Sequence, residues 1–279
     1  MRSLGLKPDC VSCHAAIEEL TGSQWQQALQ ILAHMQRQGM SPDISAYKVC
    51  MDLCQKCSQW REALKLLADM ESHSLRPDEE SFLLGLEACI RQPSTEAYNT
   101  LLMICRQYGN WVMAAVAIEG LKVANVTSYN LAMAACIPEA PHIAIDILDM
   151  MIKSSELAPD IITFNTALEA FGLMSPTYKP WQKALLLLAE MQEKHVDPDV
   201  NSYNMAIHTC NRGCQWQLAL QLLHDMQEKD VQPDKSTYLA ARNACEKGCK
   251  WRHAYILDLK TRGLPCQWDC ICKLCKPSL

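Results

Sequence analysis

Residues 200–234 read VNSYNMAIHTCNRGCQWQLALQLLHDMQEKDVQPD, and this stretch decides the fold. In its first half, Tyr203, Ala206 and Cys210 recur at the spacing of one helix face. Its second half begins at Trp216 and carries an apolar stripe at intervals of three and four residues. The stretch therefore predicts two antiparallel helices joined by a short turn.

The ends of these two helices also have sequence signals. Gly213 follows the first stripe, where we expect it to adopt the left-handed conformation that ends many helices. Pro233 follows the second stripe and stops it. A helix pair this short cannot bury both of its faces alone, so neighbouring pairs must stack.

The same pattern recurs along the chain at intervals of 34 to 39 residues. Pro-Asp pairs close the copies, at 8–9, 42–43, 77–78, 159–160, 198–199 and 233–234. Tryptophan marks the start of the second helix, at positions 25, 60, 111, 181, 216 and 251. The sequence therefore predicts an all-α fold, an α-solenoid of stacked helix-turn-helix repeats.

We expect the repeat array to cover residues 10–265, after the remnant of a preceding repeat at 1–9 and before a cysteine-rich tail at 266–279. Its units are 10–43, 44–78, 79–94, 95–125, 126–160, 161–199, 200–234 and 235–265. The unit 79–94 is partial, because a second first-helix signature begins directly after it. The extra residues 174–180 predict a longer loop between two helices.

The repeat pattern resembles a known family. V-x-(S/T)-(Y/F)-N, then W-x-x-A-L-x-L-L-x-x-M, and a closing Pro-Asp at about 35 residues are similar to the pentatricopeptide repeat. The tetratricopeptide repeat has a similar period but lacks the terminal Asp and the following Tyr-Asn. The resemblance implies a right-handed superhelix that binds single-stranded RNA with roughly one base per repeat.

The resemblance also implies which residues read the bases. In the family, the reading pair is the residue after the early aromatic together with the last residue of the repeat. Three pairs match the combination that the family uses for uracil: Asn130 with Asp160, Asn165 with Asp199, and Asn204 with Asp234. Asn99 with Asn125 resembles the looser pyrimidine pair. The expected target is therefore a pyrimidine followed by three uracils.

Other repeats depart from the family pattern. The first reading position holds His14, Lys48, Leu83 and Leu239 in the remaining units. An alternative explanation of the Asn and Asp residues is structural, because Asp before a helix is an ordinary N-cap. The alternative function is a helical scaffold for protein partners that lacks specific RNA binding.

Charge is distributed unevenly. The chain carries a formal net charge of −5, but residues 235–279 hold nine basic and three acidic residues. This basic end could anchor phosphates, or it could belong to a terminal repeat that needs charge for solubility. We expect no membrane partner, because no apolar run approaches the roughly 20 residues of a membrane helix.

The 16 cysteines fall into groups. Six occupy one equivalent place in the first helices: Cys54, Cys89, Cys105, Cys136, Cys210 and Cys245. Cys214 and Cys249 share a second place, and we expect both groups to pack as small apolar residues in a reducing compartment. Cys266, Cys270, Cys272 and Cys275 crowd the tail, but their spacing lacks two separated zinc knuckles, so we expect no metal site.

The common enzyme motifs are absent. The sequence has no H-E-x-x-H, no phosphate-binding G-x-x-x-x-G-K-[ST], no G-x-S-x-G and no deaminase H-x-E with P-C-x-x-C. We therefore expect a binding protein that is not an enzyme and has no cofactor. Residues 1–20 do not resemble a transit peptide, which predicts either a fragment or a chain without its presequence. A mitochondrial or chloroplast location is implied by the family resemblance.

Overall fold

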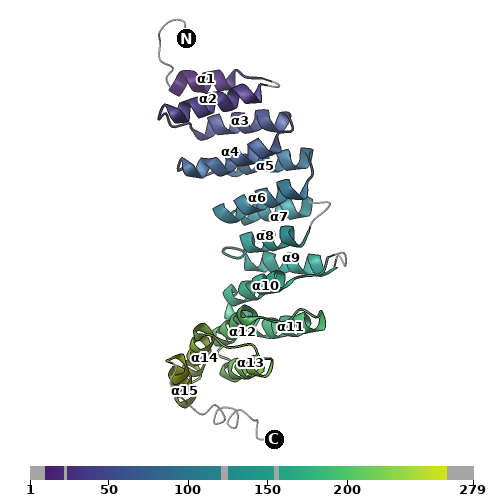
Figure 1. Cartoon of the computed structure of the whole chain (residues 1–279), viewed down its shortest axis with the longest axis vertical. Coiled ribbons are helices and arrows are strands. Elements are labelled where there is room, and N and C mark those ends of the chain that lie inside the picture. The colour runs from purple at the N-terminus through teal and green to yellow at the C-terminus, as the bar shows by residue number, and fades with distance from the viewer. Residues whose placement is uncertain (1–9, 22–23, 121–124, 154–156, 263–279) are drawn as a thin grey trace. The chain divides into compact units, whose positions relative to one another are not determined.

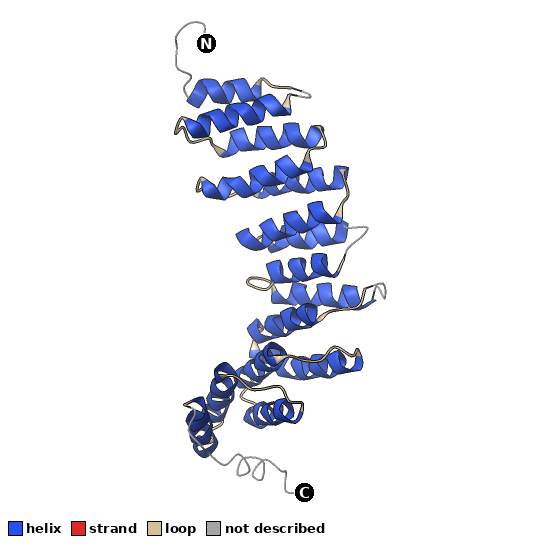
Figure 2. Cartoon of the chain, in the orientation of Figure 1, coloured by secondary structure: helices blue, strands red, loops and turns tan. Residues whose placement is uncertain are grey.

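The computed structural model describes residues 10–21, 24–120, 125–153 and 157–262. Within these ranges the chain forms helices joined by loops and turns, and no strand (Figure 2). The expected all-α repeat fold is confirmed. None of the helices in these ranges combines the length and the apolar character that crossing a bilayer requires.

The chain divides into two compact units, residues 1–136 and 137–279. In the first unit the helices follow one another in chain order (Figure 1). They are α1 (Cys10–Glu18), α2 (Trp25–Arg37), α3 (Ile44–Lys56), α4 (Trp60–Ser72), α5 (Glu79–Arg91), α6 (Thr95–Tyr108), α7 (Trp111–Gly120) and α8 (Val126–Cys136).

The second unit begins between the two helices of the repeat that starts at Val126. Its α-helices are α9 (Pro141–Lys153), α10 (Ile161–Leu173), α11 (Pro180–Glu193), α12 (Val200–Arg212), α13 (Trp216–Glu228), α14 (Lys235–Lys247) and α15 (Trp251–Thr261). The long loop of the repeat that begins with α10 contains a short 3-10 helix, η2 (Pro176–Tyr178).

Each unit has two layers of helices. The first helices of successive repeats pack on one another: α3 lies between α1 and α5, α6 contacts α8, and α12 lies between α10 and α14. The second helices, such as α4 and α13, pack against the flanks of these first helices. Fully buried side chains from both layers, including Phe164, Tyr203, Leu67 and Met226, form the core between them.

The partial repeat contains α5 alone. Only residues 92–94 separate α5 from α6, and α6 then packs against both α4 and α5. Gly85 on α5 lies where α4 packs closely on this helix. A Cβ atom there would lie 3.2 Å from Leu67, 3.3 Å from Leu64 and 3.4 Å from Leu101, which belongs to α6. The small residue therefore makes room chiefly for α4, and its distance to α6 is close to an ordinary contact.

The expectation that Gly213 is left-handed is wrong. Gly213 has φ −80°, and the next residue, Cys214, takes the positive φ of 56°. The reason for glycine is space, because a Cβ at Gly213 would lie 2.5 Å from Cδ1 of Trp181 in the preceding repeat. Gly248 repeats the arrangement, with Trp216 Cδ1 at 2.4 Å. Tryptophan at the start of each of these second helices thus packs on the end of the next first helix.

The cysteine expectations are correct for one group and wrong for the other. All six first-helix cysteines are buried. Burial raises the pKa of Cys54, Cys89, Cys105 and Cys210 to about 12 each, so these thiols stay protonated at neutral pH. Cys214 and Cys249 are instead exposed, because they occupy the left-handed turn after the helix rather than its apolar face.

Cys249 is strained by its left-handed backbone, with φ 55°. Replacing it by glycine should raise the free energy of unfolding by roughly 0.5–1 kcal/mol, because glycine removes a left-handed penalty of about 1–2 kcal/mol while adding entropy to the unfolded chain. Urea unfolding measures the change. Cys249→Ala is the control, since it removes the thiol and keeps the strain. Equal gains for both variants would contradict the backbone explanation.

Candidate nucleic-acid interface

The last residue of each repeat caps the first helix of the next. The side-chain oxygen accepts a hydrogen bond from the backbone N–H three residues later. The N···O distances are 2.9 Å for Asp43 with Ala46, 3.0 Å for Asp78 with Ser81, and 2.8 Å for Asn125 with Ser128, Asp160 with Thr163, Asp199 with Ser202, and Asp234 with Thr237. Such a cap stabilises a helix by about 1 kcal/mol, so these residues have a folding role whatever they bind.

Asn165 and Asp199, although 34 residues apart, meet between α10 and α12. Asn165 Nδ2 donates to Asp199 Oδ1 at 3.2 Å. Asn165 Oδ1 lies 2.6 Å from the Ser202 hydroxyl, which can donate to it. A carboxylate only accepts hydrogen bonds, so it fixes the amide with its NH2 group toward Asp199. The Asn165 side chain is half-buried.

Asn204 and Asp234 repeat this arrangement between α12 and α14. Asn204 Nδ2 lies 3.4 Å from Asp234 Oδ1 and 3.0 Å from Ser236 Oγ, while its Oδ1 accepts from the Thr237 hydroxyl at 2.5 Å. Burial alone would raise the pKa of Asp234, but hydrogen bonds from Thr237, Ser236 and Asn204 outweigh it and lower the pKa to about 2. The carboxylate is therefore ionised at neutral pH.

The Asn99 and Asn125 pair is joined differently. The Ser128 hydroxyl lies 2.6 Å from Asn99 Oδ1 and 2.8 Å from Asn125 Oδ1, so its single proton can be donated to either amide oxygen but not to both at once. No carboxylate orients the Asn99 amide in this pair. The geometry is thus looser than at Asn165 and Asn204.

The Asn130 and Asp160 pair is divided between the two compact units. Asn130 lies in α8, where its side chain is buried with 9% of its surface exposed. Asp160 caps α10 in the second unit through a complete capping box with Thr163.

The departing repeats place a histidine, a lysine or a leucine at the predicted reading position. His14 Nε2 lies 2.9 Å from Asp43, and Lys48 Nζ lies 2.5 Å from both Asp78 and Glu80. Leu83 and Leu239 are 43% and 42% exposed. The position therefore faces the repeat-terminal residue in these two repeats as well, with an imidazole at His14 and an ammonium at Lys48 in place of an amide.

A hollow of about 330 Å³ lies beside Asn204 on the first-helix layer of the second unit. Its lining includes Leu173, Met205, His208 and Ser236. Burial, together with the charges of Arg212 and Lys247, lowers the pKa of His208, so its ring is neutral at pH 7. The hollow offers apolar surface and a neutral imidazole next to an oriented amide.

The depressed pKa of Asp234 has a consequence for acid stability. An ionised Asp234 stabilises the fold fully above its unfolded pKa of 3.8, and this contribution is lost as the pH falls toward about 2. Asp234→Asn keeps an N-cap residue and removes the charge. We expect the variant to be less stable than the wild type at pH 6, and the difference to disappear by about pH 2. Urea unfolding at several pH values measures this, and a constant difference would contradict it.

Comparison with known proteins decides the family. The pentatricopeptide repeat domain model matches residues 1–57 and 186–247, and the PPR repeat model matches residues 45–75. The chain belongs to the pentatricopeptide repeat family. The longer match includes Asn204 and Asp234, so the last complete reading pair of this pentatricopeptide repeat protein lies in a recognised segment. No curated protein matches the chain.

Solved structures of pentatricopeptide repeat proteins share the fold. The chain matches PPR10 in complex with an 18-nt psaJ RNA element at a TM-score of 0.50 and 19% identity, over 96% of this chain and 42% of that one. It therefore spans less than half the length of PPR10. Weaker matches are PPR10 from maize (TM-score 0.36, 16% identity, 96% and 56% covered) and the PPR domain of Arabidopsis thaliana protein-only RNase P 1 with tRNA (0.39, 16%, 82% and 95%).

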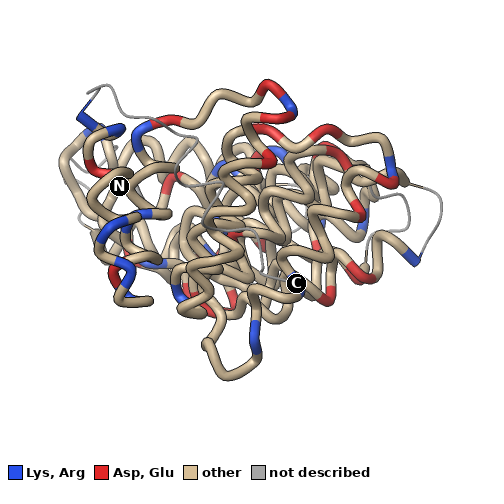
Figure 3. Tube along the Cα trace, turned by 90° about the horizontal axis from the view of Figure 1, so that it is seen from below, with Lys and Arg blue, Asp and Glu red and all other residues tan. Residues whose placement is uncertain are grey.

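The basic end of this pentatricopeptide repeat protein is partly neutralised from within. Arg242 and Arg262 both pair with Asp258, at 2.9 Å and 2.8 Å, and Lys250 lies over the Trp216 ring at 5.1 Å. Figure 3 shows Lys and Arg interspersed with Asp and Glu along the trace.

The residues 1–9 and the tail, with Cys266, Cys270, Cys272 and Cys275, lie outside the described residues. Within those residues, no cluster of His, Cys, Asp and Glu could hold a metal ion.

Sequence reasoning missed the hydroxyl beside three of the four predicted reading pairs. Ser128, Ser202 and Thr237 are fully buried, and each hydroxyl lies within hydrogen-bond distance of both the Asn and the repeat-terminal residue. The Ser/Thr in V-x-(S/T)-(Y/F)-N, three residues after the capping Asp, was the available signal. The lining of the hollow by His208 and Leu173 had no such signal.

Proposed function

We propose that this chain binds single-stranded RNA through its first-helix layer and selects uracil and other pyrimidines at roughly one base per repeat. The observation that carries the proposal is the orientation of the Asn165 amide by Asp199. Asn204 and Asp234 repeat it in the next unit. The proposed cellular role is processing, stability or translation of organellar transcripts in mitochondria or chloroplasts, with Asn130 and Asp160 as a third uracil pair.

The amide of Asn165 keeps hydrogen-bonding capacity for a base. An asparagine amide has two N–H donors and two acceptor lone pairs. Within the described residues, Asn165 uses one donor toward Asp199 and one lone pair toward Ser202. One N–H and one lone pair remain, which match a carbonyl oxygen and the N3–H of uracil. Because Asp199 prevents the amide from flipping, this donor and acceptor order is fixed.

The looser pair, Asn99 with Asn125, would contribute less base discrimination than the oriented pairs. Asn99 and Asn125 lack an orienting carboxylate, so we propose that they accept either pyrimidine. Phosphate contacts from Lys and Arg supply affinity without sequence information. The likeness in fold to PPR10, whose structure contains an RNA element, supports RNA as the ligand class.

Binding to homopolymers tests the proposal. Fluorescence anisotropy should show tighter binding of oligo-U than of oligo-A, and the preference should persist as salt is raised while both affinities fall. Nonspecific phosphate binding alone predicts equal dissociation constants for the two oligomers. Equal affinity would therefore contradict base reading.

The burial of Asn130 favours the second candidate function, a helical scaffold for proteins, because a side chain 9% exposed offers little surface to a base. A scaffold would retain its protein partners in pull-downs after nuclease treatment and would show only salt-sensitive, sequence-independent RNA binding. Loss of the partners on nuclease treatment would favour the RNA function.

A further inference from the structure

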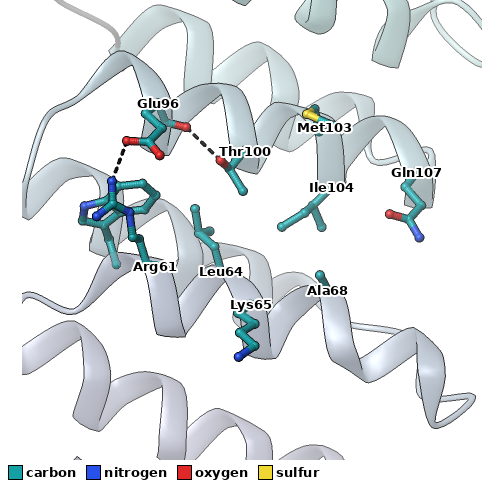
Figure 4. A pocket seen from close by; sticks show the side chains of 10 residues that line it. Arg61, Leu64, Lys65, Ala68, Glu96, Thr100, Met103, Ile104 and Gln107 are labelled. Carbon is teal, nitrogen blue, oxygen red and sulfur yellow. Dashed lines mark hydrogen bonds and ion pairs between the residues drawn. The ribbon is translucent and has the colours of Figure 1, made fainter.

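A groove runs between α4 and α6 in the first unit (Figure 4). Its volume is about 430 Å³, within the range of roughly 300–1,000 Å³ typical of ligand sites. Leu64 and Ile104 form a buried apolar floor, and Met103, which is 60% exposed, forms a wall. All of its lining residues come from these two helices.

The groove exists because the chain omits a helix. In the second unit, the first helices α10, α12 and α14 each have their own second helix, α11, α13 and α15. Here α5 is followed directly by α6, so α4 contacts α6 with no second helix from the intervening repeat. Apolar surface that other repeats cover with their own chain is left open to a partner.

The two helices that line the groove, α4 and α6, run parallel (Figure 4). Arg61 and Glu96, each the second residue of its helix, form an ion pair at 2.8 Å that closes one end of the groove. From there the groove extends past Leu64 to Ala68. Seven residues of helix span about 10 Å, which equals the distance between anchor side chains at i and i+7 of a bound helix. A groove between two parallel helices with this length fits a third helix.

The charge on the rim defines the partner. Arg61 is already paired with Glu96, but Lys65 is exposed and forms no ion pair with any residue that the structure describes. A carboxylate on the bound helix would form an ion pair with Lys65. A second copy of the chain fits poorly, since its exposed aromatic helix α15 (Trp251 and Tyr255, each 65% exposed) is basic.

From these features we infer that the groove docks an amphipathic helix of a partner protein, with apolar anchors at i, i+4 and i+7 and an acidic residue facing Lys65. Met103 adapts its flexible side chain to the anchors. The two lining helices, α4 and α6, flank the partial repeat. None of the lining residues is a proposed RNA-reading residue, although Asn99 also lies on α6.

A displayed library of helical peptides tests the inference. The probe is a peptide of about 15 residues, long enough for roughly four turns, with apolar anchors at fixed positions and randomised flanks. It is selected on the full chain and counter-selected on Ala68→Trp, which fills the groove. Selected peptides should carry Asp or Glu beside the anchors. Enrichment that is equal on the Ala68→Trp chain, or enrichment without acidic residues, would overturn the inference.

Charge reversal gives a second test that does not depend on filling the groove. Lys65→Glu should weaken a selected acidic peptide by roughly tenfold or more, equivalent to losing one charge contact. It should restore binding to the same peptide with Lys in place of the acid. Lys183→Glu, an exposed lysine on α11, is the matched control and should change nothing. Displacement of the peptide by oligo-U, or dimers abolished by Ala68→Trp, would assign the groove to another occupant.

Discussion

Gly248→Ala should lower the free energy of unfolding by roughly 1–3 kcal/mol, the usual cost of overpacking a core. The backbone of Gly248 has φ −80°, which alanine adopts freely. The loss comes from space alone, because the new Cβ would lie 2.4 Å from Cδ1 and 2.8 Å from Cγ of Trp216. The ring is held by the next repeat, with Lys250 above it and His253 at 5.7 Å. Urea unfolding measures the difference.

Two controls separate this contact from a general effect of alanine. Gly172→Ala lies in the last turn of α10, where the new Cβ would meet Thr209 and His208 at ordinary distances of 3.7 Å and 3.8 Å. That variant should be more stable than the wild type by about 0.5–1 kcal/mol. A double-mutant cycle of Gly248→Ala with Trp216→Ala should give a clear coupling energy. Strict additivity would show that Trp216 is not the obstacle.

The double variant Asn165→Leu, Asn204→Leu should reduce the preference for oligo-U over oligo-A by about 100-fold. Each amide that pairs with a base contributes roughly 1–3 kcal/mol of discrimination. The salt dependence of binding should stay unchanged, because no phosphate contact is removed. Parallel anisotropy titrations with both oligomers at two salt concentrations measure the two effects separately.

The matched control makes the same chemical change on the other helix layer. Gln217→Leu with Gln221→Leu replaces two exposed amides of α13 and should leave the preference intact. Circular dichroism should show the same helix content for both double variants. A loss of preference in the α13 control, or its retention in the Asn variant, would contradict reading by Asn165 and Asn204.

The repeat architecture could be predicted from the sequence because each unit carries its own helix signals. The stripe from Trp216 and the break at Pro233 are local, and both helices form where the period predicts. The role of Gly213 could not be read locally. It depends on Trp181, which lies 32 residues earlier in sequence and in contact only after the repeats stack. The error at Cys214 has a local origin, since the left-handed turn after the helix displaces it from the apolar face.

The candidate interface was predictable as positions but not as geometry. The family resemblance selects Asn165 and Asp199, and the structure brings their side chains to 3.2 Å. Spacing could not show that the Ser202 hydroxyl joins them or that Asn130 is largely buried. The groove between α4 and α6 could not be predicted from the sequence either. It depends on the tertiary packing of α6 against α4, which occurs because the partial repeat lacks a second helix.

Under the proposed base reading, the folding role of the repeat-terminal residue restricts which residues can be used there to change base specificity. Asp199 and Asp234 each start the following helix and orient the amide of the preceding one. Only Asp, Asn, Ser and Thr, with Gly less favoured, start helices well. The set of residues that could change the proposed base specificity at this position is therefore limited by helix capping. A repeat that ends in any other residue would lose the N-cap of the first helix in the following repeat. The proposed base specificity of one repeat is therefore coupled to the stability of the next.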